Sequence, residues 1–402
     1  MQKVFVVDGF RSPIGQLGGQ LATWRPDDVL AELIRALVQK YPSLDLNAIE
    51  DVVIGCANQA GEDNRNIARM SLLLAGLPFS VPGETVNRLC ASGMSAIINA
   101  HARLAAGEGM LMLAGGIESM TRSPWVMSKS SQPFGRDVEL FDSSFGWRFV
   151  NPKMKAMYGV DPMGNTAENL AELYKISRED QDFFAYRSQQ KCKAATEAHL
   201  FDQEILPLEW STKSGNMTFA VDEFPKPNST LEKLSTLRPA FKSDGSVTAG
   251  NSSGLNDGGC ITLLATEEAM RLYDLKPLVS IKSHAVVGVE PRIMGIGPVA
   301  ATQKALQRAN ITLDQIDIIE LNEAFAAQVL ACTRALGLND DDPRVNLQGG
   351  AISLGHPLGM TGARLILTCA KQLVRERKRW GLCTMCIGVG QGYAVVLENS
   401  NV

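Results

Sequence analysis

The sequence predicts an α/β protein built from two similar halves, with a loop-rich segment inserted into the first half. Three observations support this prediction. Strand-like apolar runs alternate with helix-like segments from Val4 to about Met120, which is typical of a mainly parallel sheet covered by helices on both faces. A segment around Cys90 recurs around His356. Residues 121–249 are richer in Ser, Pro, Asn and charge, and neither half repeats there.

The internal repeat is a βα unit that is used twice. One constant offset aligns four residues of each copy: Cys90 with His356, Gly93 with Gly359, Met94 with Met360, and Ser95 with Thr361. Strand-like segments upstream, at 49–54 and 316–321, correspond at nearly the same offset. Small changes of offset are what surface-loop insertions produce. The repeat therefore places a cysteine in one half where the other half has a histidine.

Cys90 is predicted to lie where a strand gives way to a helix. An apolar run ending at Leu89 precedes it, and the residues from Gly93 to Gly107 have helical character. Free N–H groups and the positive dipole end of a helix favour a thiolate over a thiol. An approximate two-fold axis between the halves would bring Cys90 and His356 together, and a Cys–His pair is an activated nucleophile. A small buried hydrophobe is the alternative for a lone cysteine.

The remaining elements define three predicted domains. We expect a strand at 4–7, a helix at 28–40 and a strand at 110–114 in the first half. Ser177, with Asp180 three positions later, opens a helix in the inserted segment. A return loop at 248–254 and a strand at 261–265 rejoin the first half. The predicted domains are residues 1–120 with 250–272, residues 121–249, and residues 273–402.

Composition and charge limit the classes of partner. The formal net charge is −4, and hydrophobic and charged residues make up 45% and 20% of the chain. This balance gives no reason to expect a nucleic acid or an anionic membrane as partner. No apolar run reaches membrane-spanning length. Eight cysteines without a secretory signal indicate reduced thiols and a cytoplasmic location.

The motif Cys383-Thr-Met-Cys386 invites a redox or zinc interpretation. It lies in an apolar strand, where residues three apart point to opposite faces. The sequence holds no second motif of this kind, so a four-cysteine zinc site is disfavoured and we expect no metal. Cys386, at the end of the strand, is the cysteine expected to face a site.

Two further motifs follow predicted strands of the second half. Asn322-Glu-Ala-Phe325 comes directly after a buried strand, where ligands of α/β sheets gather; a helix cap by Asn322 is the alternative. The run from Gly388 to Gly392 lies between two strands, so it predicts a tight turn that offers N–H donors. A dinucleotide loop would instead open a helix. The other histidines are interpreted as structural: His101, His199 and His284.

Together these motifs resemble those of the thiolases. The matching segments are VNRLCASG at Cys90, NEAF at Asn322, GHPLGMTGAR at His356 and CIGVGQG at Cys386, in the family's order and along essentially the whole chain. The resemblance implies the thiolase fold, with duplicated α/β domains in five layers (αβαβα) and an inserted loop domain. It implies cleavage of a 3-oxoacyl-CoA by coenzyme A into acetyl-CoA and a shortened acyl-CoA, or the reverse Claisen condensation. It also implies no cofactor, coenzyme A being a substrate, and a homodimer or homotetramer.

The resemblance also implies roles for individual residues. Cys90 would carry the acyl group, His356 would take its proton, and Cys386 would be the second acid/base. One oxyanion hole would combine His356 with a water held by Asn322, and the other the N–H groups of Cys90 and Gly388. The substrate contacts implied are Ser253 for pantetheine, Met163 for the acyl pocket and Lys226 for the nucleotide. Phe325 is a further residue expected to contact the substrate or coenzyme A. Many thiolases have a histidine where this chain has Pro162, which leaves the shape of the acyl pocket open.

Two segments point to a particular substrate. GCANQAGEDNRN (residues 55–66) and GWRFVNP (residues 146–152) look most like 3-oxoadipyl-CoA thiolases of aromatic catabolism. That substrate ends in a free carboxylate, for which Arg148 is the hypothetical partner; an ordinary surface arginine is the alternative. An acetoacetyl-CoA or general fatty 3-ketoacyl-CoA thiolase remains an alternative, as does an NAD-dependent oxidoreductase from another class. A ketosynthase would need a second catalytic histidine, and a hydroxymethylglutaryl-CoA synthase a glutamate.

Overall fold

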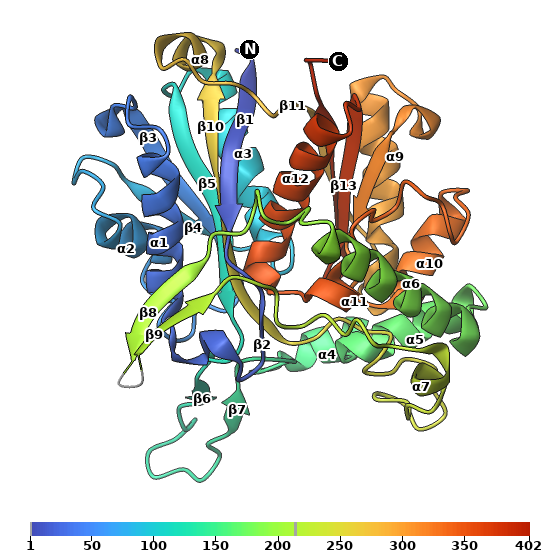
Figure 1. Ribbon diagram of the computed structural model, residues 1–402. Coiled ribbons are helices and arrows are strands. Elements are labelled where there is room, and N and C mark those ends of the chain that lie inside the picture. Colours follow the sequence, from blue (N-terminus) through green and yellow to red (C-terminus); the bar gives the residue numbers. More distant parts are fainter. Residues whose placement is uncertain (1, 213–214) are drawn as a thin grey trace.

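Figure 1 shows the computed structural model of the protein, which describes residues 2–212 and 215–402. Its main sheet consists of two half-sheets, one formed by each half of the chain. Across the first half the order of strands is β4 (Gly83–Val86), β3 (Ile49–Gly55), β5 (Leu111–Ser119), β10 (Asn256–Thr266) and β1 (Val4–Arg11). The order continues with β11 (Val279–Gly288), β14 (Gln391–Glu398), β13 (Trp380–Ile387) and β12 (Ile318–Leu321). β1 and β11 join the halves by pairing at two positions, Phe5 with Ser280 and Val6 with Val279.

The strand directions correct one expectation. β3 is parallel to β4 and β5, and β12 is parallel to β13. The other pairs, around β10 and β14, are antiparallel. The prediction of a mainly parallel sheet is therefore wrong. β10 returns from the long insertion antiparallel to both its neighbours, and β14 follows β13 through a tight turn, which forces an antiparallel pair.

Helices and half-sheets alternate in five layers, as Figure 1 shows. α1 (Pro26–Gln39) and α2 (Ile67–Leu74) cover the outer face of the first half-sheet. α3 (Ser92–Ala106) and α12 (Leu358–Arg375) form the middle layer. α9 (Gly297–Ala309) and α10 (Ala326–Ala335) cover the second half-sheet. α1 begins two residues before its predicted start because Pro26 occupies the first turn, where proline is favoured.

The two copies of the repeat meet at the start of α3 and α12. A Cβ atom on Gly93 would lie 2.6 Å from the carbonyl oxygen of Gly359, and one on Gly362 would lie 2.6 Å from the backbone N of Met94. Only glycine allows helix backbones to approach this closely. The expected juxtaposition of the two helix starts is thereby confirmed.

The inserted segment packs across the lower part of the molecule in Figure 1. Its elements are β6 (Trp125–Met127), β7 (Leu140–Asp142), α4 (Pro152–Tyr158), α5 (Met163–Leu173), α6 (Arg178–Glu197), β8 (Leu208–Thr212), β9 (Gly215–Phe219) and α7 (Leu231–Ser235). Ser177 caps α6 as predicted, its Oγ accepting the N–H of Asp180 at 3.0 Å. The fully buried Arg11 of β1 pairs with Glu204 and Asp222, both at 2.6 Å, and so fastens the segment to the first half.

Short elements complete the chain. They are β2 (Gly15–Gln16), α8 (Glu267–Leu272), α11 (Ala351–Leu354) and the 3-10 turns Gln20–Thr23, Leu46–Ala48, Pro291–Ile296 and Leu313–Gln315. The loop 248–254 lies outside regular structure as expected, and β10 contains the strand expected at 261–265. Among the helices of the described residues, none combines the length and apolarity needed to cross a membrane.

Candidate active site

Cys90 lies in a tight turn between β4 and α3. The strand ends at Val86, earlier than predicted, because the Asn87 side chain accepts the N–H of Leu89 at 2.8 Å and Leu89 adopts a left-handed conformation (φ 48°). Ser92 holds the other side of the turn, since its Oγ accepts the N–H of Arg88 and donates to the Leu89 carbonyl. The half-buried Cys90 is thus presented two residues before α3 begins.

His356 lies in the corresponding turn before α12 and is buried. Its backbone N–H donates to Asn256 Oδ1 at 3.0 Å. Its Nδ1 lies 2.7 Å from Thr361 Oγ1, and that hydroxyl donates its single hydrogen to the carbonyl of Pro357 at 2.8 Å. Thr361 must therefore accept from Nδ1–H, so the lone pair of the neutral imidazole is on Nε2.

Asn322 faces that lone pair. It follows β12 directly, and its Nδ2 lies 3.4 Å from His356 Nε2. Phe325, not Asn322, occupies the N-cap of α10, so the helix-cap alternative is excluded. The Asn322 Oδ1 is buried without a hydrogen-bond partner among the described residues. A buried acceptor of this kind calls for a water or a substrate group.

Cys386, near the end of β13, and Gly388, in the turn after β13, belong to the same site. Cys386 is buried in a small cluster of inward-facing apolar residues, comprising Ala167, Val247, Met294, Ala324 and Phe325 with Met163 and Phe241 beside them. Cys383 points to the opposite face, its Sγ 3.4 Å from the Leu365 carbonyl of α12. The predicted division of the two cysteines is therefore confirmed. Gly388 lies in the turn between β13 and β14, as expected.

Burial keeps all three reactive groups neutral. It raises the pKa of Cys90 to about 11, although the N–H groups of Gly388 and Cys90 act in the opposite direction. Burial and, to a lesser extent, Arg364 lower the pKa of His356 to about 3. Burial and the nearby Cys90 thiol raise the pKa of Cys386 well above its usual value. The local N–H groups thus favour the thiolate relative to the thiol, as the helix start leads one to expect, but desolvation outweighs them.

The residues expected at the acyl and pantetheine region border this cluster. The Met163 sulfur would lie 3.8 Å from a Cβ on Gly388. Ser253 donates its backbone N–H to the Ala324 carbonyl at 3.0 Å, and its neighbour Ser252 bridges to Phe325. These contacts align the 248–254 loop with the NEAF segment.

Lys226 and Arg148 both lie in the inserted segment. The Lys226 Nζ lies 5.1 Å from the centre of the Phe224 ring, and Phe224 packs against Gly254. The half-buried Arg148 donates to Asn58 Oδ1 at 2.7 Å and to the Ser143 carbonyl at 3.2 Å. No carboxylate of the described residues pairs with Arg148.

Three residues that hold the site were missed from sequence. Thr361 and Asn256 bind His356, and Glu118 binds the first turn of α12 through Gly359 N–H at 2.8 Å. Glu118 carried a usable signal, because a charged residue near the end of an otherwise apolar strand is uncommon unless it has a partner. Asn256, at the start of β10, carried no comparable signal, and the alignment of Thr361 with Ser95 in the repeat did not point to His356.

Comparisons with known proteins agree with this geometry. The family described as "Thiolase, N-terminal domain" matches residues 4–268, and "Thiolase, C-terminal domain" matches residues 275–399. A beta-ketoadipyl-CoA thiolase of Acinetobacter baylyi is 54% identical over 399 residues, covering 99% of this chain and 100% of the relative. A 3-oxoadipyl-CoA/3-oxo-5,6-dehydrosuberyl-CoA thiolase of Escherichia coli is 52% identical, with the same coverage. The crystal structure of human mitochondrial 3-ketoacyl-CoA thiolase matches with a TM-score of 0.92 at 38% identity, covering 99% of each chain. The chain belongs to the thiolase family, and it is an acyltransferase with the thiolase fold.

Proposed function

We propose that the protein cleaves 3-oxoadipyl-CoA with coenzyme A into acetyl-CoA and succinyl-CoA. The observation that carries the proposal is the held tautomer of His356, whose Nε2 carries the lone pair and lies 3.4 Å from Asn322 Nδ2. Support for the substrate comes from the relatives named beta-ketoadipyl-CoA and 3-oxoadipyl-CoA thiolases, which match the chain along its whole length. Cys90, with its raised pKa, needs such a base at the moment of attack.

The first half-reaction forms an acyl-enzyme. His356 Nε2 accepts the Cys90 proton as the sulfur attacks the 3-oxo carbon of the substrate. The resulting oxyanion lies against the N–H groups of Cys90 and Gly388. The bond between C2 and C3 then breaks, leaving the acyl group on sulfur. The enolate of acetyl-CoA, stabilised by His356 and Asn322, takes a proton at C2 from the Cys386 thiol.

The second half-reaction releases the shortened acyl-CoA. The Cys386 thiolate accepts the proton of the incoming coenzyme A thiol, whose sulfur attacks the Cys90 thioester. The C–S bond to Cys90 breaks, and His356 returns its proton to the Cys90 sulfur. No electron is gained or lost overall, so the cycle requires coenzyme A as a substrate and no redox cofactor. Ser253, Met163, Phe325 and Lys226 are proposed to hold the coenzyme and acyl chain.

Arg148 is proposed to recognise the terminal carboxylate of the acyl chain. Its guanidinium uses one donor for Asn58 and one for the Ser143 carbonyl, leaving donors for a bidentate carboxylate. The neighbouring Trp147 binds the Asp161 carbonyl, two residues before Met163. Asn87, in the Cys90 turn, binds the Ala57 carbonyl next to Asn58. Arg148 therefore lies between the segments that lead to the acyl pocket and to the nucleophile.

The direct test combines substrate comparison with acyl labelling. Thiolysis of 3-oxoadipyl-, acetoacetyl- and long-chain 3-oxoacyl-CoA is measured by kcat/KM, and the acyl-enzyme is located by mass spectrometry. We expect 3-oxoadipyl-CoA to be preferred and the label on Cys90, absent from Cys90→Ala. A preference for acetoacetyl- or long-chain substrates would replace the substrate assignment with one of those thiolases. Reduced nicotinamide binding without thiolysis would refute the activity itself.

We also propose a homotetramer in the cytoplasm. The β6–β7 hairpin projects from the body in Figure 1 and exposes Trp125, Met127 and Leu140, an apolar surface suited to a second copy. The eight cysteines are all free thiols, which fits a reducing compartment. Replacing Trp125 and Leu140 with serine is expected to reduce the mass measured by light scattering. An unchanged mass would refute the role of the hairpin.

A further inference from the structure

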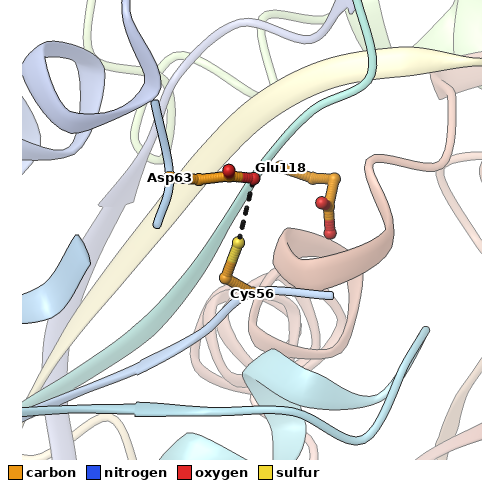
Figure 2. A group of neighbouring side chains, drawn as sticks. All are labelled: Cys56, Asp63 and Glu118. Atoms are coloured by element: carbon orange, nitrogen blue, oxygen red, sulfur yellow. Dashed lines mark hydrogen bonds between the residues drawn. The ribbon is translucent and has the colours of Figure 1, made fainter. Parts of the chain in front are cut away.

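Cys56, Asp63 and Glu118 form a fully buried cluster beside the site, shown in Figure 2. One ligand atom from each lies within 4.8 Å of the others, which suggests a metal site. The carboxylates, however, already accept backbone N–H groups. Glu118 accepts those of Ala57, Asn58 and Gly359, and Asp63 accepts those of Gln59 and Gly61. Carboxylate oxygens that already accept five N–H groups are poor ligands for a cation. The cluster therefore has a role other than metal binding.

Glu118 spans the two halves of the molecule. Its Oε1 accepts the Asn58 N–H at 3.1 Å, and its Oε2 accepts the Gly359 N–H at 2.8 Å. Gly359 is in the first turn of α12, whose N-cap residue, Pro357, provides no side-chain acceptor. A carboxylate at this position satisfies a free N–H and opposes the helix dipole. Glu118 therefore supplies from β5 the cap that α12 lacks.

The packing around this contact leaves little freedom. A Cβ on Gly116 would collide with the Gly359 carbonyl, and one on Gly359 with the Ile117 carbonyl. The end of β5 thus lies directly against the start of α12, three residues after His356. Gly359 belongs to the same turn as His356, so the Glu118 contact is placed to influence where the imidazole lies.

We propose that ionised Glu118 is a positioning residue that holds His356 in reach of Cys90. The inference rests on the proposed roles of those two residues. Misplacement by about 1 Å can cost about 100-fold in rate, so a capping carboxylate outside the reacting atoms can govern kcat. Glu118 also ties the same turn to Asn58, whose side chain holds Arg148.

Glu118 changes its ionisation near neutral pH. Burial raises its pKa to about 7, helped by Asp63 and opposed by the three N–H groups. The other titratable groups around it are Cys56 and Cys90, with Asp257 on the adjoining strand β10. Glu320, whose pKa is also raised to about 7, is bonded instead to Arg364 and Gln372. Protonation of Glu118 places an O–H where an N–H needs an acceptor.

The test compares Glu118→Gln with Asp63→Asn, a matched loss of charge in the same cluster without contact to α12. Glu118→Gln should lower kcat about 10- to 100-fold, leave KM within about 3-fold, and abolish the acidic limb of the kcat profile near pH 7. Asp63→Asn should keep kcat within about 3-fold and move that limb to lower pH, because a negative neighbour has been removed. Normal kcat and an unchanged limb in Glu118→Gln would overturn the proposal.

Two further measurements separate this proposal from its alternatives. Glu118→Asp keeps the charge but retracts it from Gly359, so kcat should fall and the acidic limb should be lost with the contact; this variant serves if Glu118→Gln does not fold. An acidic limb belonging to Glu320 would persist in Glu118→Gln and so count against the proposal. Failure of Cys90 labelling refutes the proposed function instead, whatever Glu118→Gln does.

Discussion

Thr361 determines which nitrogen of His356 carries the proton. Their contact is 2.7 Å, and the Thr361 hydroxyl is committed as a donor to the Pro357 carbonyl. His356 thus needs no ion pair to keep its Nε2 lone pair toward Asn322. Arg364 contributes in the same sense, because its charge disfavours a resting imidazolium.

Thr361→Val should therefore impair proton transfer more than substrate binding. The isosteric side chain cannot accept from Nδ1–H, so the tautomer and ring orientation are no longer fixed. We expect kcat for thiolysis to fall about 10- to 100-fold with little change in KM. Thr361→Ser keeps the hydroxyl and should stay within a few-fold of the wild type. Equal losses in both variants would mean that the methyl group, not the hydrogen bond, matters.

Cys386→Ala should separate the two half-reactions. Cys90 and His356 are untouched, so the variant should still accept an acyl group from acyl-CoA, as seen by mass spectrometry. Turnover should drop by about 100-fold or more because no group remains to move the C2 proton. Cys383→Ala, a neighbouring cysteine on the opposite face of β13, is the control and should stay active. Full activity in Cys386→Ala would remove its assignment.

Arg148→Ala should discriminate between substrates. Loss of a charged hydrogen bond to carboxylate is worth about 1.5–3 kcal/mol, so kcat/KM for 3-oxoadipyl-CoA should fall at least about 10-fold. Acetoacetyl-CoA, which lacks the carboxylate, should be affected far less. Arg136→Ala, an exposed arginine of the same inserted segment, is the control. Equal losses of kcat/KM on both substrates in Arg148→Ala would show that Arg148 is an ordinary surface arginine that does not recognise the carboxylate.

We expect His101 to lower the free energy of unfolding in mildly acidic solution. Burial lowers its pKa to about 4, and its Nδ1 has no partner among the described residues. Between pH 6.5 and 4 the unfolded chain binds a proton that the folded chain excludes. Stability is therefore lost as pH falls through this window, by at most about 1.4 kcal/mol per unit.

The comparison of variants isolates that contribution. Buried Glu118, with its raised pKa, has the opposite dependence between about pH 4.5 and 7, so the wild-type slope alone is not diagnostic. His101→Leu should lose less free energy of unfolding than the wild type when denaturant titrations move from pH 6.5 to 5. An identical slope in His101→Leu would contradict the assignment.

Much of the architecture was predictable because it depends on local pattern and on the repeat. The correspondence of Cys90 with His356 predicted a contact between segments far apart in sequence, and the glycine packing confirms it. The opposite faces of Cys383 and Cys386 followed from strand alternation. The domain boundaries, the assembly and the catalytic roles stay predictions.

What escaped prediction depends on long-range contacts. The direction of β10 is set by a long insertion whose path no local pattern encodes. The protonation of Cys90 depends on burial by both halves, which outweighs the local helix end. Glu118 lies in the first half and Gly359 in the second half. The sequence around either residue therefore does not reveal the hydrogen bond between them.

The glycine contacts at Gly93, Gly359 and Gly362 have a consequence for how this enzyme can evolve. A single methyl group at this junction would clash with the backbone of the other half and push the two helix starts apart. A substitution at the junction in one half must therefore be accommodated by the other half, so the two copies of the repeat can change there only together.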